Sequence, residues 1–341
     1  MTVGPIPVIR AAYLDLFMGA AGPCASNDPA SLLQFNLPAN LDDKPDAYVP
    51  LKTALSFAQR AAQGSDIEAL GIKVGSRLQV SHFGAGLRSA LQGAASLERA
   101  LECFARLADR EQSNVHYRID RTGDEVQICS SVDAAPPSET EYLGEWLRIM
   151  SLMTVIRYFT GNEWMPPAIA LQSHRVPGQH ARRAFPRTRF LTGQAETGII
   201  IPASLLSLAT TRNYPRRGVA GVPGTESAAT GPASWDFTVS LQEIVQTYLD
   251  DGYPDINLAA NIIGCSVRTL QRRLKEFGLS YTDVVQQARF RLATDLLSDP
   301  GTKVIDAALA VGYEDPSHFA RAFKRLAGIS PNQYRRLNYA H

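Results

Sequence analysis

The feature that most constrains this chain is an internal repeat near its C-terminus. The segment Ala260-Asn-Ile-Ile-Gly264 aligns with Ala308-Leu-Ala-Val-Gly312 at an offset of 48 residues. A repeat of this length indicates one supersecondary unit that has been duplicated. The match continues with small insertions: Leu270, Arg272, Leu274 and Lys275 align with Phe319, Arg321, Phe323 and Lys324, and Gly278-Leu-Ser280 aligns with Gly328-Ile-Ser330.

Each copy has the pattern of a helix-turn-helix unit, which is a short helix, a tight turn and a second helix. Gly264 and Gly312 stand in the two turns, where the chain needs a positive φ that glycine adopts at little cost. The small Ala260 and Ala308 allow the two helices of each unit to approach closely. Ser266 is a favourable N-cap for the second helix of the first copy.

The second helix of each copy, predicted over 267–277 and 316–327, separates apolar from basic side chains. Each segment carries a net charge of +3, although residues 234–341 contain 12 Lys and Arg against 12 Asp and Glu. One such helix is equally compatible with a solvated surface, but two in register favour helices that read DNA. The apolar sides are Val267, Leu270, Leu274 and Phe277, and Phe319, Phe323 and Leu326; the outward sides are Arg268, Gln271, Arg272 and Lys275, and Ser317, Arg321, Lys324 and Arg325.

The clearest break in composition runs from 211 to 233, where Pro and Gly recur and large apolar residues are almost absent. This composition is typical of a linker. It predicts an α+β domain over 1–210, a flexible linker over 211–233, and an all-α domain over 234–341. The last domain is expected to hold two helix-turn-helix units joined by a long helix, with helices over 236–250, 257–263, 267–277, 282–297, 304–311 and 316–327.

The N-terminal part combines helical and strand periodicity, which predicts its α+β class. Residues 115–120 and 125–130 flank Arg121-Thr-Gly-Asp124 and predict a β-hairpin with Gly123 in its turn. Further elements are predicted as helices over 50–63, 97–110 and 139–159 and as short strands over 168–176 and 198–202.

Composition and charge exclude several classes of protein. The formal net charge of +1 gives no general affinity for polyanions, so DNA binding depends on where the basic residues lie. Cys24, Cys103, Cys129 and Cys265 form no Cys-x-x-Cys pair, which disfavours a zinc site or a disulfide framework. The apolar stretch over 11–24 is interrupted by Asp15 and is too short to span a membrane. We therefore expect a cytoplasmic, nucleoid-associated bacterial protein with no metal, no cofactor and no membrane partner.

The segment Val304-Ile-Asp-Ala-Ala-Leu-Ala-Val-Gly-Tyr-Glu-Asp-Pro-Ser-His-Phe319 and its continuation to Arg335 resemble the C-terminal signature of AraC/XylS-type transcription regulators. The resemblance continues upstream through Ser266-Val-Arg-Thr-Leu-Gln-Arg-Arg-Leu-Lys275. It implies seven helices, with the long one at 282–297 placing both recognition helices in successive major grooves on one DNA face. It implies base contacts at Arg268, Gln271, Arg272, Ser317 and Arg321, to which we add the neighbouring His318; phosphate contacts are expected from Arg273, Lys275, Lys324 and Arg325.

Two further positions refine what the resemblance implies. Arg289 lies on the connecting helix where the family usually has an arginine, and we expect it to form an internal ion pair with Asp306. Pro316 has no backbone N–H to donate and stands where members of the family vary. The first recognition helix is therefore expected to supply most of the base specificity, and the second more of the positioning and affinity.

The N-terminal part resembles the arabinose-binding-like domain of one subgroup of this family. The matching segments are Leu37-Pro-Ala-Asn-Leu41, Ala47-Tyr-Val-Pro-Leu51, the region 84–107 and Gly161-Asn-Glu-Trp-Met-Pro166. The resemblance implies a domain for effector sensing and dimerisation and does not by itself imply a sugar. Aromatic and polar side chains are candidates for an effector pocket, each also explained as core or surface: His82, Tyr117, Tyr142, Trp146, Arg148 and Trp164.

A basic run from His180 to Arg189 adds a hypothesis about the effector. It holds four Arg in ten residues, and Arg183 and Arg187 are four positions apart, a spacing able to hold a carboxylate or a phosphate. The alternative is a solvated basic loop, or a contact to a DNA phosphate or to a partner.

Other functions are less compatible with the sequence. No nucleotide-binding, α/β-hydrolase or zinc-protease motif occurs in it, so we expect no enzyme. An architectural DNA binder would not need about 210 residues in front of a complete DNA-binding module. We therefore expect a ligand-responsive regulator, more an activator than a repressor. Its expected partners are double-stranded promoter DNA, RNA polymerase, a small-molecule effector and a second copy of itself.

Overall fold

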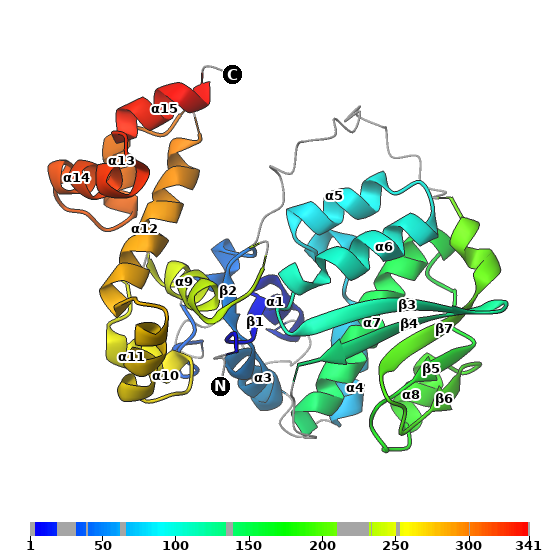
Figure 1. Ribbon diagram of the computed structural model, residues 1–341. Coiled ribbons are helices and arrows are strands. Elements are labelled where there is room, and N and C mark those ends of the chain that lie inside the picture. Colours follow the sequence, from blue (N-terminus) through cyan, green and yellow to red (C-terminus); the bar gives the residue numbers. More distant parts are fainter. Residues whose placement is uncertain are drawn as a thin grey trace.

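The computed structural model describes residues 4–18, 32–38, 40–61, 66–133, 139–209, 232, 234–249, 253–299 and 301–339. An α+β part and a helical part lie side by side, so the predicted fold class is confirmed (Figure 1). Cys24 and the predicted linker, apart from Pro232, lie outside the described residues. None of the described helices is long and apolar enough to cross a bilayer.

A five-stranded sheet forms one side of the N-terminal part. The predicted hairpin is confirmed, and its strands extend to Thr122 and Glu125, which pair directly across a turn at Gly123-Asp124. Gly123 has a φ of 61°, which a two-residue hairpin turn favours. The strand order is β3 (Val115–Thr122), β4 (Glu125–Val132), β7 (Thr197–Pro202), β5 (Ala168–Ala170) and β6 (Arg189–Leu191), and the edge strand β6 was not predicted.

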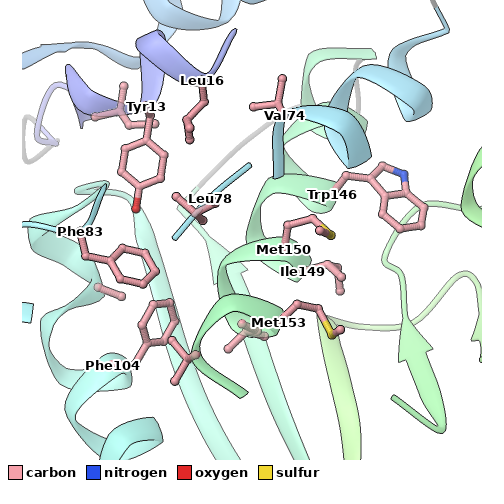
Figure 2. Close-up of a cluster of buried hydrophobic side chains, with 14 of the residues drawn as sticks. Tyr13, Leu16, Val74, Leu78, Phe83, Phe104, Trp146, Ile149, Met150 and Met153 are labelled. Carbon is pink, nitrogen blue, oxygen red and sulfur yellow. The ribbon is translucent and has the colours of Figure 1, made fainter. Parts of the chain in front are cut away.

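The helix α7 (Glu139–Thr160) runs through the core of the N-terminal part and packs against α4 (Ile67–Ser76) and β7. Its apolar residues surround the helix instead of forming one stripe, which is the pattern of a buried helix. Figure 2 shows Trp146, Met150 and Met153 of α7 in this core, with Phe83 and Phe104 across the cluster from Trp146. Further helices of this part are α5 (Ala85–Gly93), α6 (Leu97–Leu107) and α8 (Gln179–Ala184).

The first fifty residues contribute a small element that the sequence did not predict. Strands β1 (Val8–Arg10) and β2 (Tyr48–Pro50) pair antiparallel, and we call this pair the N-terminal ribbon. Arg10 is 4% exposed and forms an ion pair with Glu111 at 3.0 Å and another with Asp46. Helices α1 (Ala12–Met18) and α3 (Leu51–Ala61) flank the ribbon, and α3 falls within the predicted 50–63.

The C-terminal part contains seven helices among the described residues, as the family resemblance implied. The long α12 (Tyr281–Leu297) joins two compact groups of helices, one at each of its ends (Figure 1). The first group is α9 (Phe237–Thr247), α10 (Ile256–Ile262) and α11 (Val267–Glu276), and the second is α13 (Val304–Ala310), α14 (Pro316–Ala327) and α15 (Pro331–Tyr339), of which α15 was not predicted.

Candidate nucleic-acid interface

The turn before α11 sets the direction of the first recognition helix. Gly264 has a φ of 70°, so the predicted positive φ is confirmed. Ala260 is 2% exposed and allows α10 and α11 to meet closely. Ser266 caps α11 by accepting a hydrogen bond from the backbone N–H of Thr269, which confirms the predicted N-cap.

The two sides of α11 differ as predicted. Leu270 and Leu274 are buried in the core of the first unit. Phe277, predicted to pack, is 42% exposed and stacks on Phe237 with 6.2 Å between ring centroids. The opposite side presents four exposed residues that can donate hydrogen bonds to base edges or phosphates: Arg268, Gln271, Arg272 and Lys275.

The second recognition helix, α14, begins and ends at well-defined caps. Asp315 accepts a 2.7 Å hydrogen bond from the backbone N–H of Ser317, and this bond holds the pKa of Asp315 below its usual range. Pro316 is the first residue of the helix, where its missing N–H removes no intrahelical bond. Gly312 in the preceding turn has a φ of 79°, and Gly328 closes the helix with a φ of 76°.

Phe319 and Phe323 anchor α14, and each is 2% exposed. Leu326 was predicted to pack beside them, but it is 42% exposed because it lies at the end of the helix, where the core no longer covers it. The remaining predicted contact residues of α14 are all exposed: Ser317, His318, Arg321, Lys324 and Arg325.

Two of the four predicted phosphate contacts also have partners within the protein. The guanidinium of Arg273 lies 5.4 Å from the ring centroid of Phe237, on a side of α11 away from Arg268. Arg325 donates a hydrogen bond to the side chain of Gln286 on α12. The side chains of Lys275 and Lys324 are both exposed, and in the described part of the chain neither makes such a contact. We therefore retain these two as the stronger phosphate-contact predictions.

Arg289 on α12 lies between aromatic rings of the two units. Its guanidinium carbon is 4.2 Å from the ring centroid of Tyr253 and 5.1 Å from that of Tyr313. The predicted ion pair with Asp306 is wrong, because Asp306 faces solvent on α13. Tyr253 precedes the first unit's α10 and Tyr313 belongs to the second unit's turn. Arg289 therefore bridges the units through cation–π contacts.

The N-terminal ribbon is part of the hydrophobic core of the first unit. Tyr48 packs edge-on against Trp235 with 5.0 Å between ring centroids. The Thr247 hydroxyl on α9 donates a 2.8 Å hydrogen bond to the Tyr48 carbonyl, and the Trp235 indole donates to the Asp109 carbonyl at 2.9 Å. Ile6, Val8 and Tyr48 share one buried cluster with Phe237, Leu241, Leu270 and Leu274. The first recognition helix is therefore fixed to the N-terminal part.

Comparison with known protein families agrees with this arrangement. The family model described as "Arabinose-binding domain of AraC transcription regulator, N-term" matches residues 28–209, more than half of the chain. A second family model, described as "Helix-turn-helix domain", matches residues 259–337. This chain belongs to the AraC family. It is a DNA-binding transcription regulator of the helix-turn-helix type.

Relatives of this AraC-family protein include regulators from several bacteria. The uncharacterized HTH-type transcriptional regulator Rv1395 of Mycobacterium tuberculosis is 25% identical over 324 residues, which cover 88% of each chain. The ornithine utilization regulator of Pseudomonas aeruginosa is 36% identical over 83 residues, 24% of each chain. A crystal structure of the transcriptional regulator CdpR from the same species is 19% identical, has a TM-score of 0.38, and covers 91% of this chain and 96% of its own.

The predicted effector residues of this AraC-family regulator fall into separate places. Tyr117 and Arg148 line one cavity of about 30 Å³ together with Glu111. Burial raises the pKa of Glu111, although Arg10 opposes the shift. Arg148 is 4% exposed and pairs with Glu141 at 2.8 Å. This cavity has room for about one water molecule.

Tyr142 and Trp146 lie on the other side of α7 from that cavity's polar groups. The Tyr142 hydroxyl donates a 2.7 Å hydrogen bond to Glu68, and Trp146 is fully buried and stacks on Phe185. His82 accepts a hydrogen bond from the Gln79 backbone N–H within a turn. These contacts give the side chains packing and capping roles in the N-terminal core.

The last candidates lie near the surface. Trp164 is half-buried after the α7 terminus, where its carbonyl accepts a 3.1 Å hydrogen bond from Arg157. Arg183 is in α8, but the helix ends at Ala184, so Arg187 lies in the following turn. Both guanidinium groups are exposed, on separate elements of one basic segment.

The structure also brings together a group that sequence spacing did not reveal. Asp66, Glu68 and His180 have potential metal-ligand atoms within 4.8 Å of one another. Glu68 already accepts hydrogen bonds from Tyr142 and from the backbone N–H groups of Gly178 and Ala181. These hydrogen bonds join α8 to α4 and explain the position of Glu68.

Proposed function

We propose that this AraC-family regulator reads promoter DNA with α11 and α14 in two successive major grooves. The observation that carries the proposal is the pair of exposed polar and basic stripes, one on each helix and each backed by buried apolar residues. A helix of this width fits the major groove, where Arg can bind guanine O6 and N7 and Gln can bind adenine N6 and N7.

Within this interface we assign most base specificity to α11. Arg268, Gln271 and Arg272 are exposed together on one side of a helix that is held by the N-terminal ribbon. On α14, Ser317, His318 and Arg321 form a smaller reading surface, and His318 lies 3.6 Å from Asp315. The second helix then contributes more to positioning and affinity than to base choice.

The regulator further responds to a small-molecule effector through residues 1–210, dimerises through the same part, and activates transcription by contacting RNA polymerase. The contacts between the α+β part and the start of the first unit support an effector response. A conformational change in the α+β part would be transmitted to α9 through these hydrogen bonds. The eight-residue edge strand β3 supports dimerisation, since an unpaired strand edge can pair with another chain. Ile305 and Leu309, 49% and 57% exposed on α13, offer a surface for the polymerase.

A salt series tests the DNA-binding proposal. Four phosphate contacts release counterions, so log affinity for promoter DNA should fall with log salt at a slope of roughly −3 to −4 per chain. Lys324→Ala should lower affinity equally on promoter and random DNA and reduce this slope by about 1. Arg99→Ala removes a charge on α6 and serves as the control that should change neither. A slope that is the same in Lys324→Ala and in the unaltered chain contradicts the assignment.

A further inference from the structure

A cavity of about 420 Å³ lies between α8 and the edge strand β6 of the N-terminal part. Small-molecule sites typically measure about 300–1,000 Å³, so this volume suits a ligand of modest size. Phe185 and Phe190 line it with Val176, Pro177 and Pro186, which gives it an apolar wall.

The aromatic wall of this cavity is held firmly. Phe185 is 2% exposed and stacks on the buried Trp146 with 6.1 Å between ring centroids and 19° between planes. Phe190 meets Phe185 edge-on at 6.4 Å. An apolar ligand group would therefore meet a preformed surface, which reduces the entropy lost on binding.

The segment that borders the cavity is strongly basic. Residues 174–189 contain five Arg and two His and no Asp or Glu. Arg182 itself lines the cavity, and its Nε donates a 3.1 Å hydrogen bond to the Pro177 carbonyl, which fixes the guanidinium at the rim. Arg183, Arg187 and Arg189 are exposed on the same segment.

These arginines differ from three other surface arginines of the N-terminal part. Arg99, Arg118 and Arg121 pair with Glu102, Glu196 and Glu98. In the described part of the chain, no carboxylate oxygen lies within 4.0 Å of the guanidinium nitrogens of Arg182, Arg183, Arg187 or Arg189. Unpaired positive charge beside an apolar cavity favours a ligand that carries a negative charge.

The position of the cavity argues against DNA as the source of that charge. Figure 1 shows α8 and β6 at the end of the N-terminal part that is away from α11 and α14. A protein partner would need an interface of roughly 800 Å² per side, whereas a small anion needs only a concave site of the volume that is present.

We propose that this cavity binds a small organic anion with an apolar, preferably aromatic, body. The body lies against Phe185 and Phe190, and the carboxylate or phosphate group lies at Arg182, with Arg187 adding to the field. The proposal rests on the proposed effector response, for which it names the ligand class. Glu68 accepts backbone hydrogen bonds from Gly178 and Ala181, so a ligand at α8 would also act on α4.

Calorimetric titration of the full chain with phenylacetate and with phenyl phosphate tests the proposal. Phenylacetamide, acetate and inorganic phosphate are the probes that lack either the charge or the ring. We expect at least one aromatic anion to bind about tenfold more tightly than all three of these. If neither aromatic anion exceeds them, the proposal is overturned.

Variants then test whether binding takes place in this cavity. The double change Arg182→Gln and Arg187→Gln should weaken the aromatic anion about tenfold or more, while Arg99→Gln, on the distant α6, should leave it unchanged. Thermal unfolding of each variant checks that the fold is retained. As a second measure, Thr188→Trp should block the cavity without removing charge and should also weaken binding. Equal affinity in all variants contradicts the assignment.

The DNA affinity of the same samples separates this proposal from the proposed function. Without ligand, DNA binding by the full chain reports on α11 and α14 alone. If the anion binds at α8 and DNA affinity or transcription does not change, the cavity assignment stands and the effector response fails. If DNA binding itself fails, the ligand titration still decides the cavity assignment.

Discussion

The two helix-turn-helix units share one sequence pattern but differ in which parts of the chain form their hydrophobic cores. The core of the first unit includes Val8 and Tyr48 from the N-terminal ribbon and the preceding Ile6, more than 180 positions earlier in the chain. The core of the second unit draws all its members from residues 290–334. The core of the first unit thus includes side chains of the N-terminal part, whereas the core of the second unit is formed by α12 and the helices that follow it.

Under the proposed effector response, this difference gives each unit its own role. Glu243 on α9 pairs with Arg291 on α12 at 2.6 Å. This ion pair holds α12, the helix that joins the two units, against the first unit. The second unit is then positioned through α12, with Arg289 between Tyr253 and Tyr313. A change in the N-terminal part would act first on α11, and α14 would follow through α12.

The largest effect is expected from emptying one unit's core at a time. Tyr48→Ala should destabilise the first unit by about 3–5 kcal/mol, because the buried ring against Trp235 is lost. Phe323→Ala should cost a similar amount in the second unit. Hydrogen exchange should become faster in α9–α11 for the first variant and in α13–α15 for the second. If both variants speed exchange in the same helices, the comparison of the units is wrong.

A smaller effect is expected at the bridge between the units. Arg289→Ala removes cation–π contacts worth about 1–2 kcal/mol, so the orientation of α14 relative to α11 should loosen. We expect weaker binding to the natural site and a broader tolerance for spacing between its two halves. Binding to DNA sites with one inserted or deleted base pair measures this tolerance, with Asp306→Ala as the control. A loss that is equal at every spacing would show that Arg289 does not set the geometry.

The smallest effect concerns the caps of the two recognition helices. The backbone hydrogen bond from Ser317 lowers the pKa of Asp315, so this cap stabilises the folded state above the unfolded pKa of about 3.9 and is lost as pH falls through the lower folded value. On acid titration the Ser317 amide resonance should shift, whereas that of Thr269, capped by the non-titrating Ser266, should not. Asp315→Asn keeps a cap and should abolish the shift. A shift of both amides together would point to general unfolding.

Local features were largely predictable from the sequence. The repeat located both turns, and the α14 boundaries agree with the prediction, because glycine, cap and apolar positions within one unit depend on neighbouring residues. The buried and exposed sides of α11 followed from helical spacing for the same reason. The predicted packing overestimated the burial of Leu326 and Phe277, because both lie at helix ends, where the core covers them only in part.

Contacts between distant segments were not predictable. Nothing near Tyr48 or Trp235 in the sequence indicates that they meet, and the same holds for Arg289 and Tyr253. The three-residue strand β6 is too short to show a period of two. Among the predicted effector residues, Tyr117 and Arg148 line a common cavity. They are 31 positions apart, and their meeting depends on how α7 packs on the sheet.

Selection of bound sequences from a random DNA pool tests the central claim most directly. The full chain, Arg272→Ala and Arg321→Ala should be compared under the same salt conditions. Arg272→Ala should cost about 1–3 kcal/mol on the selected site and remove a base preference in one half of it. Arg321→Ala should lower affinity and leave the preferred sequence largely intact. A sequence preference that survives Arg272→Ala and disappears in Arg321→Ala would contradict the assignment of specificity to the first unit.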